Sequence, residues 1–394
     1  MNILNSIKNS ALIMGEENKE EIKTQDKKRV AINGFGRIGR AFLKMSLANE
    51  NFEVVAVNDL GDIHNMAYLL KYDTVYKRSN FEVEIEEVSE TEKYLIIKSS
   101  AAEGGASKVE VNASPDKKTK DSSQKIKFLS QRDPLLLPWK DLNIDIVIES
   151  TGLFTSYDKA KVHIICGAKR VIISAPAKAG EDKSVMGETV LMSVNENKLS
   201  VCDITSNASC TTNASSPLIA ILDATVGIEK AMLNTVHAYT ASQSIVDGPN
   251  KKDYREGRAG AQNIVPSSTG AAIAVGKVFT QLDGRFDGIA MRVPVAAGSI
   301  VDITFIAKRE TSTEEINNIL RDAAKQDKWK NIFDASDEEL VSSDIQGSHF
   351  ASIADLKMTR VVGGNLVKVL GWYDNEMGYT NTLVMHAEKV AKLL

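Results

Sequence analysis

A cysteine with polar neighbours is the first candidate for chemistry in this sequence. Cys210 is one of three cysteines, and it lies in "SNASCTTN" at residues 206–213. A structural cysteine usually sits among apolar side chains, where it packs as a small hydrophobe. Here Ser209 and Thr211 flank the sulfur with hydroxyl groups that suit a thiolate or an oxyanion. A free thiol has a pKa of about 8.5, so a nucleophilic cysteine needs a nearby base or cation.

Five histidines could supply that base, namely His64, His163, His237, His349 and His386. His237 ranks first because "LNTVHAYTASQ" puts it at the end of an apolar strand, shortly before hydroxyl residues. A lone histidine in such a pattern also fits a purely structural role, so both interpretations stay open at this point.

Two arginines and a hydroxyl-rich turn are candidates for binding anions. Arg292 stands inside the apolar pattern of "MRVP". A buried charge needs a partner, and a substrate phosphate or a structural carboxylate would serve equally well. Arg258 lies in "REGRAG". The stretch "PSSTGAA" at 266–272 has hydroxyls and a glycine at an expected helix start, which fits an anion site or simple N-capping.

Three glycines near the start of the chain have the spacing of a dinucleotide site. Gly34, Gly36 and Gly39 follow an expected strand in "RVAINGFGRIGR" and open an expected helix. Asp59 ends the next expected strand, about 20 residues further on. The glycines allow a tight turn, a close approach of the backbone to a pyrophosphate and close helix–strand packing. Asp59 would accept from both ribose hydroxyls and repel a 2′-phosphate, so the pattern predicts NAD rather than NADP.

The elements that must position these residues suggest two domains. The chain has 394 residues, which is long for one core. Short apolar strands such as "RVIISAP" are typical of the first half, and longer ones such as "SIVDITFIAK" of the second. The predicted fold class is α/β, with a Rossmann-type, mostly parallel sheet domain plus an α+β catalytic domain that has a mixed or antiparallel sheet. Residues 1–28 are predicted to form a disordered arm, and residues 99–124 a polar surface insertion.

Composition and charge argue against several classes of function. The net charge is −4, so no overall field favours nucleic acid or an anionic membrane. Three cysteines do not make a disulfide framework, no Cys/His spacing is typical of zinc, and no apolar run approaches the ~20 residues of a membrane span. The first residues lack the features of a secretory signal or a transit peptide. We therefore expect a cytoplasmic setting, no metal, and no nucleic-acid or membrane partner.

Taken together, these stretches resemble the phosphorylating glyceraldehyde-3-phosphate dehydrogenases. The resemblance runs from about residue 29 to the C-terminus and includes "INGFGRIGR", "IESTGLFT", "SNASCTTN", "TVHAYTASQ", "QNIVPSSTGAA" and "GWYDNEMGYTN". It implies an NAD-binding Rossmann domain at 29–209, a catalytic domain at 210–374, and a C-terminal helix at 375–394 that packs back on the first domain. It also implies a homotetramer that converts glyceraldehyde 3-phosphate and inorganic phosphate to 1,3-bisphosphoglycerate through a cysteine thioester.

The resemblance further implies a role for each candidate residue. Cys210 would be the nucleophile, and His237 would be the general base that lowers the pKa of the thiol. The substrate's own phosphate would bind at Thr240 and Arg292. The attacking phosphate would bind at Ser209, Thr269, Gly270 and Arg258, with Thr211 beside them. The contacts to NAD would come from Gly34, Gly36, Arg37, Ile38, Gly39, Asp59, Arg78, Ser150, Asn375 and Tyr379.

The sequence departs from the family pattern at a few positions, and two alternatives stay open. Ala214 replaces a frequent second cysteine, so no disulfide can form there. Lys77 stands where glycine is usual before Arg78, which weakens the assignment of Arg78 to the adenine side. One alternative is an erythrose-4-phosphate dehydrogenase, which shares the nucleophile and the base. The other is a non-catalytic NAD-binding scaffold protein, although such a protein would be expected to have lost Cys210 or His237.

Overall fold

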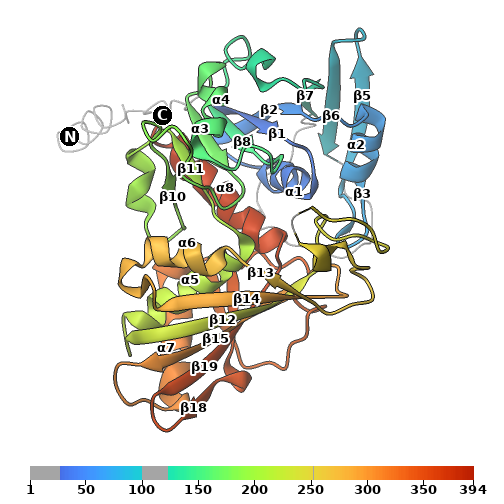
Figure 1. Cartoon of the computed structure of the whole chain (residues 1–394). Coiled ribbons are helices and arrows are strands. Elements are labelled where there is room, and N and C mark those ends of the chain that lie inside the picture. The colour runs from blue at the N-terminus through green and yellow to red at the C-terminus, as the bar shows by residue number, and fades with distance from the viewer. Residues whose placement is uncertain (1–26, 100–122, 252) are drawn as a thin grey trace, which may run out of the picture.

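Two separate sheets organise the protein in the computed structural model, which describes residues 27–99, 123–251 and 253–394 (Figure 1). The predicted arm at 1–28 and the predicted insertion at 99–124 lie almost entirely outside these residues. The predicted arm overlaps the start of strand β1 at Lys28, and the predicted insertion overlaps the start of strand β7 at Ser123. The two predictions otherwise stay predictions.

The first sheet has nine strands in the order β10-β11-β9-β8-β1-β2-β7-β6-β5. All neighbouring pairs from β10 to β7 are parallel, whereas β7, β6 and β5 pair antiparallel. The bounds are β1 (Lys28–Asn33), β2 (Phe52–Asn58), β5 (Phe81–Glu87), β6 (Lys93–Ser99), β7 (Ser123–Leu129), β8 (Ile146–Glu149), β9 (Arg170–Ile173), β10 (Glu188–Thr189) and β11 (Ile204–Ser206).

Strand β1 lies between β2 and β8. The chain adds β2 on one side of β1 and later adds β8 on the other side, so the strand order reverses at β1. Helix α1 (Arg37–Ser46) connects β1 to β2, and helix α2 (Ile63–Lys71) follows β2. A short hairpin of β3 (Tyr72–Asp73) and β4 (Lys77–Arg78) comes next. Ligands of open parallel sheets bind in the crevice at the carboxyl ends of the strands where the order reverses. The topology therefore opens a crevice beside the glycine turn that follows β1.

The second sheet is mixed, with the order β13-β14-β12-β15-β19-β17-β16 and β18 paired to β19. The pairs β12–β14 and β16–β17 are parallel and the others antiparallel. The bounds are β12 (Ile228–Ala238), β13 (Val265–Ser268), β14 (Phe286–Val293), β15 (Ser299–Ala307), β16 (Phe333–Ser336), β17 (Ser352–Asp355), β18 (Arg360–Val362) and β19 (Leu366–Tyr373).

Helices cover one face of the second sheet, and the side chains on its other face are exposed. Helices α5 (Cys210–Asp223), α6 (Ala271–Val278) and α7 (Thr313–Ala324) contact the sheet. Side chains alternate between the faces of a strand. On β12 and β14 this alternation leaves Met232 and Ile289 58% and 47% exposed. The open face is therefore partly apolar.

The C-terminal helix α8 (Met377–Ala391) lies against the half of the molecule that holds the first sheet (Figure 1). It packs on α1, and the Asn49 side chain donates a hydrogen bond to Glu388 at 2.6 Å. Its buried His386 meets the Thr205 hydroxyl on β11 at 2.9 Å. The predicted fold class, one mostly parallel sheet and one mixed sheet, is confirmed. No helix within the described ranges is long and apolar enough to cross a membrane.

Candidate active site

A strained turn delivers Cys210 to the start of helix α5. Ala208 has a φ of 56°, which is unusual for a residue other than glycine. The Tyr379 hydroxyl donates to the Ala208 carbonyl at 3.1 Å and helps to hold this turn. Ser209 caps the helix by accepting from the Thr212 amide at 3.1 Å, so Cys210 is the first helical residue. The positive end of the helix dipole there favours an anionic sulfur or oxygen.

His237 meets this cysteine from the second sheet. Its Nε2 lies 3.3 Å from Cys210 Sγ. The other ring nitrogen, Nδ1, lies 2.7 Å from the Ala238 carbonyl oxygen and 2.6 Å from Arg292 Nη1. One tautomer cannot satisfy both of those contacts. We favour a proton on Nδ1, because the carbonyl can only accept and because this tautomer leaves Nε2 free to take the thiol proton.

Burial and the charge of Arg292 act on the pKa values of both the thiol and the imidazole. Burial, and then the charge of Arg292, lower the pKa of His237 to about 3. Burial raises the pKa of Cys210 and outweighs the opposing effect of Arg292. The role of His237 as a general base that lowers the pKa of the thiol stays a prediction.

Arg292 is brought to the site by strand pairing. Strand β14 runs parallel to β12, and the register sets Arg292 beside His237. Among the described residues Arg292 forms no ion pair with a carboxylate, and its buried Nε has no hydrogen-bond partner. Of the two partners that the sequence left open, a structural carboxylate is therefore absent from this part of the chain. A partly exposed cation with a buried, unpaired donor suits a bound anion.

The other predicted phosphate ligands are more dispersed. The Thr240 hydroxyl lies 3.0 Å from the Ser242 hydroxyl, just after β12. Thr269 Oγ1 accepts from the Ala271 amide at the start of α6, where Gly270 leaves open space. Arg258 is 62% exposed and its Nε donates to Asp247 at 2.8 Å. No contact among the described residues joins Arg258 to Cys210, so its role toward phosphate stays a prediction.

The glycine turn after β1 fits a pyrophosphate. Gly34 has a φ of 96°, and a Cβ on it would lie 2.6 Å from the Thr151 amide nitrogen. A Cβ on Gly39 would lie 2.2 Å from the Gly34 carbonyl oxygen, so the helix can approach the strand only with glycine there. Around Gly36 the space is open, and no side chain caps α1. The turn therefore combines a cradle with helical N–H groups that a phosphate can use.

Asp59 and Ser150 hold the two sides of this turn. The Asp59 carboxylate accepts from the Phe35 amide at 2.7 Å and from the Gly61 amide at 2.8 Å. The Ser150 hydroxyl donates to the Gly34 carbonyl at 2.7 Å. Asp59 is thus oriented at the end of β2 and retains lone pairs for a ribose diol.

Two predicted cofactor contacts have side chains that are engaged elsewhere. The Arg37 guanidinium pairs with Asp73 and Glu376, so a contact to phosphate would come from the backbone N–H groups of Arg37 and Ile38. Arg78 is exposed and donates to Glu82 at 2.7 Å. The preceding Lys77 has a φ of 66°, which explains why glycine is common at that position.

Asn375 and Tyr373, at or just beyond the end of strand β19, contact residues of the site and of the turn before β15. Asn375 Oδ1 accepts from the Gly298 amide at 3.2 Å and from the Ser299 hydroxyl at 3.0 Å. The buried Tyr373 hydroxyl lies 3.1 Å from Thr211 Oγ1, and its ring packs edge-on against His237. Tyr373 was not among the predicted residues. Its place on the inward face of an alternating strand in "NLVKVLGWYD" is the signal that could have found it.

Comparisons with known proteins agree with this geometry. A family described as "Glyceraldehyde 3-phosphate dehydrogenase, NAD binding domain" matches residues 28–103 and 90–157. A second, "Glyceraldehyde 3-phosphate dehydrogenase, C-terminal domain", matches residues 209–375. The chain is 45% identical to a glyceraldehyde-3-phosphate dehydrogenase of Streptomyces coelicolor over 90% of this chain and 96% of that protein. It is 40% identical to one of Clostridium pasteurianum over 93% and 99%, respectively. The chain belongs to the glyceraldehyde-3-phosphate dehydrogenase family.

Proposed function

We propose that this protein oxidises glyceraldehyde 3-phosphate with NAD and inorganic phosphate, and forms 1,3-bisphosphoglycerate through a thioester on Cys210. The observation that carries this proposal is the 3.3 Å contact between Cys210 Sγ and His237 Nε2 at the start of a helix. The names of the relatives and the fit of the glycine turn to a pyrophosphate support it.

The chain's own groups account for each chemical step. Cys210 attacks the aldehyde carbon while His237 Nε2 takes the thiol proton, which gives a hemithioacetal. The Cys210 backbone N–H and the protonated imidazole stabilise its oxygen. NAD, when bound, supplies the acceptor for the hydride that leaves this carbon. His237 first gives the thiol proton to this oxygen, which makes the hemithioacetal hydroxyl, and takes the proton back as the hydride leaves and the thioester forms. Phosphate then displaces the sulfur, and the leaving thiolate recovers the proton from His237.

The substrate's phosphate is assigned to Arg292 and Thr240. Arg292 lies beside the reacting pair and has a free buried donor, so a dianion there would complete its hydrogen bonds. The attacking phosphate is assigned to Ser209, Thr269 and Gly270 with Arg258, which would exchange Asp247 for the anion.

The protein is further proposed to act as a homotetramer in the cytoplasm. The open face of the second sheet exposes Met232 and Ile289. The segment between β12 and β13 exposes Ile245 by 88% and Tyr254 by 87%. Apolar side chains exposed in such groups favour contact with another protein surface, and a second copy is the simplest partner.

A rapid-mixing trace of NADH absorbance tests the phosphorylating step. Without phosphate, acylation should release about one NADH per site and then stall, which is the burst expected of covalent catalysis. Phosphate should restore steady turnover. Linear turnover at full speed without phosphate would contradict the proposal, because water would then be the acyl acceptor. Higher catalytic efficiency on erythrose 4-phosphate than on glyceraldehyde 3-phosphate would favour the alternative substrate.

A further inference from the structure

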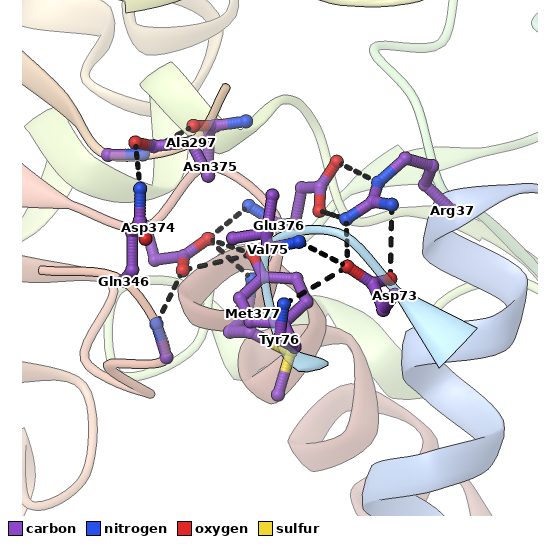
Figure 2. A network of polar contacts seen from close by, with 12 residues as sticks. Arg37, Asp73, Val75, Tyr76, Ala297, Gln346, Asp374, Asn375, Glu376 and Met377 are labelled. Atoms are coloured by element: carbon purple, nitrogen blue, oxygen red, sulfur yellow. Dashed lines mark hydrogen bonds and ion pairs between the residues drawn. The ribbon is translucent and has the colours of Figure 1, made fainter. Parts of the chain in front are cut away.

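Asn375 stands between two acidic residues, and the first of them is held from the other half of the molecule. Asp374 is fully buried. The Tyr76 hydroxyl donates to its two oxygens at 2.8 and 3.0 Å, and the Gly347 amide donates at 2.8 Å (Figure 2). Asp374 also accepts from the backbone amides of the next turn, at the start of α8. Tyr76 belongs to the hairpin segment after α2, so this segment grips the chain directly before Asn375.

The second acidic residue, Glu376, is held by Arg37. The guanidinium makes a bidentate pair with Glu376 and a second ion pair with Asp73 at 3.0 Å (Figure 2). Asp73 also accepts from the Val75 and Tyr76 amides at 2.9 and 3.1 Å. The same carboxylate therefore braces Arg37 and the turn that carries Tyr76.

The pKa shifts of Asp73 and Tyr76 favour the protonation states that the network uses. Burial would raise the pKa of Asp73, but hydrogen bonds from the Tyr76 amide and the charge of Arg37 lower it overall. Burial, and then the Asp374 carboxylate, raise the pKa of Tyr76, so the phenol remains a donor.

The Asn375 side chain itself has only one free end. Its Oδ1 is occupied by the Gly298 amide and the Ser299 hydroxyl. The amide nitrogen points away from Ala297 (Figure 2). The Gln346 amide supports that segment by donating to the Ala297 carbonyl at 3.3 Å. Asn375 therefore presents a donor in a fixed direction, which suits a carbonyl oxygen.

We propose that Arg37, Asp73 and Tyr76 form a positioning clamp on Asp374 and Glu376, which sets Asn375 to receive the carboxamide of the nicotinamide ring. Arg37 is the first residue of α1, whose N-terminus faces the proposed pyrophosphate site. The clamp thus fixes the distance between the two ends of the cofactor site. This inference rests on the proposed NAD-dependent function, and it assigns the clamp residues no contact with the reacting atoms.

Binding of NAD and of ADP-ribose, which lacks the nicotinamide, tests the clamp. Glu376→Gln removes the charge that holds Arg37, and calorimetry should show NAD affinity about ten-fold weaker, the size of one charge-assisted contact. ADP-ribose should bind as it does to the wild type. Equal losses for both ligands would overturn the inference, because the clamp would then act at the phosphates or on overall stability. Unchanged affinity for both would overturn it as well.

Three further variants make the test specific. Tyr76→Phe removes a single hydroxyl and should show the same selective loss of NAD affinity, even if Glu376→Gln folds poorly. Glu315→Gln is the matched control, since it breaks an exposed bidentate pair with Arg309 in the other half of the molecule. In Asn375→Ala the effect of Glu376→Gln should vanish, and full additivity would contradict a clamp that acts through Asn375. A wild-type protein that binds ADP-ribose but not NAD would instead refute the proposed function.

Discussion

At the scale of single residues, the chemistry depends on how burial shifts the pKa values of Cys210 and His237. Cys210 and His237 touch, burial raises the pKa of the thiol, and burial together with Arg292 lowers the pKa of the imidazole. A phosphate bound at Arg292 would offset the charge of that arginine and ease protonation of His237. Under the proposed assignment of the substrate phosphate to Arg292, binding of the aldehyde would therefore help to activate the thiol.

Replacing His237 should separate the base from the nucleophile. In His237→Asn the thiol loses its proton acceptor, so turnover should fall by roughly 10²–10⁴-fold. Alkylation of Cys210 by iodoacetamide at neutral pH should also slow, measured as loss of free thiol by mass spectrometry. Cys210→Ala provides the background for that assay. An alkylation rate equal to that of the wild type would show that the imidazole does not activate the sulfur.

Asp59 should decide the choice of cofactor. Asp59→Ala removes the acceptor for the ribose hydroxyls and the repulsion of a 2′-phosphate, so NAD should bind about ten-fold more weakly while NADP is rejected less. The measurement is the ratio of kcat/KM for the two cofactors. Asp62→Asn is the control, because it alters a nearby carboxylate that caps α2. A wild type that uses both cofactors equally well would contradict the electrostatic argument.

At the scale of elements, helix α8 braces the turn that carries the nucleophile. Tyr379 holds the Ala208 carbonyl, and His386 lies between the Thr205 hydroxyl and Asn207 Oδ1. These contacts join the last helix to the end of β11, directly before the strained turn. The last helix therefore helps to position the residues directly before Cys210.

The buried His386 should make stability depend on pH in a definite direction. Burial lowers its pKa to about 3, whereas an unfolded histidine titrates near 6.5. Below about pH 6.5 the unfolded state binds the extra proton, so stability is lost as the pH falls, by up to about 1.4 kcal/mol per pH unit. His386→Gln cannot take up that proton, so its Tm should fall less than that of the wild type between pH 7 and pH 5.

Two comparisons make this measurement specific. His237 contributes with the same sign in the wild type and in the variant, so part of the slope remains. His64→Gln changes an exposed histidine that contacts Glu87, and it should keep the wild-type slope. An identical pH dependence for His386→Gln and the wild type would refute the role assigned to His386.

At the scale of the whole molecule, the second sheet has one face that the described helices do not cover. Helices cover one face of the second sheet, and its other face exposes apolar side chains of β12 and β14. Assembly through this face would bury the apolar surface and bring together copies of the catalytic half.

Charged substitutions on that face should therefore dissociate the oligomer. Met232→Lys combined with Ile289→Lys places two cations where we expect apolar contact, and light scattering should show a smaller particle than the wild type. Val88→Lys, an exposed apolar position on the first half, is the matched control and should leave the mass unchanged. A wild-type mass equal to one chain of 42.9 kDa would refute the homotetramer itself.

The sequence by itself determined the features that depend on local backbone and side-chain pattern. The spacing of Gly34, Gly36 and Gly39 identified the turn, because the positive φ of Gly34 and the close backbone approach at Gly34 and Gly39 favour glycine. The change from short apolar strands to longer strands similarly predicted the two kinds of sheet, since strands buried on both faces are apolar throughout. The polar surroundings of Cys210 singled it out for the same local reason.

Only the tertiary structure decided which of these residues meet and in what state of charge. Cys210 and His237 are 27 positions apart, and their contact depends on how α5 packs on β12. Arg292 reached the pair through the register of β14, and its lack of a carboxylate partner among the described residues could not be read from "MRVP". Arg37 and Glu376 are 339 positions apart, so their ion pair is invisible to any local pattern. Distances between separate elements, and the burial that shifts each pKa, arise only when the sheets and helices pack together.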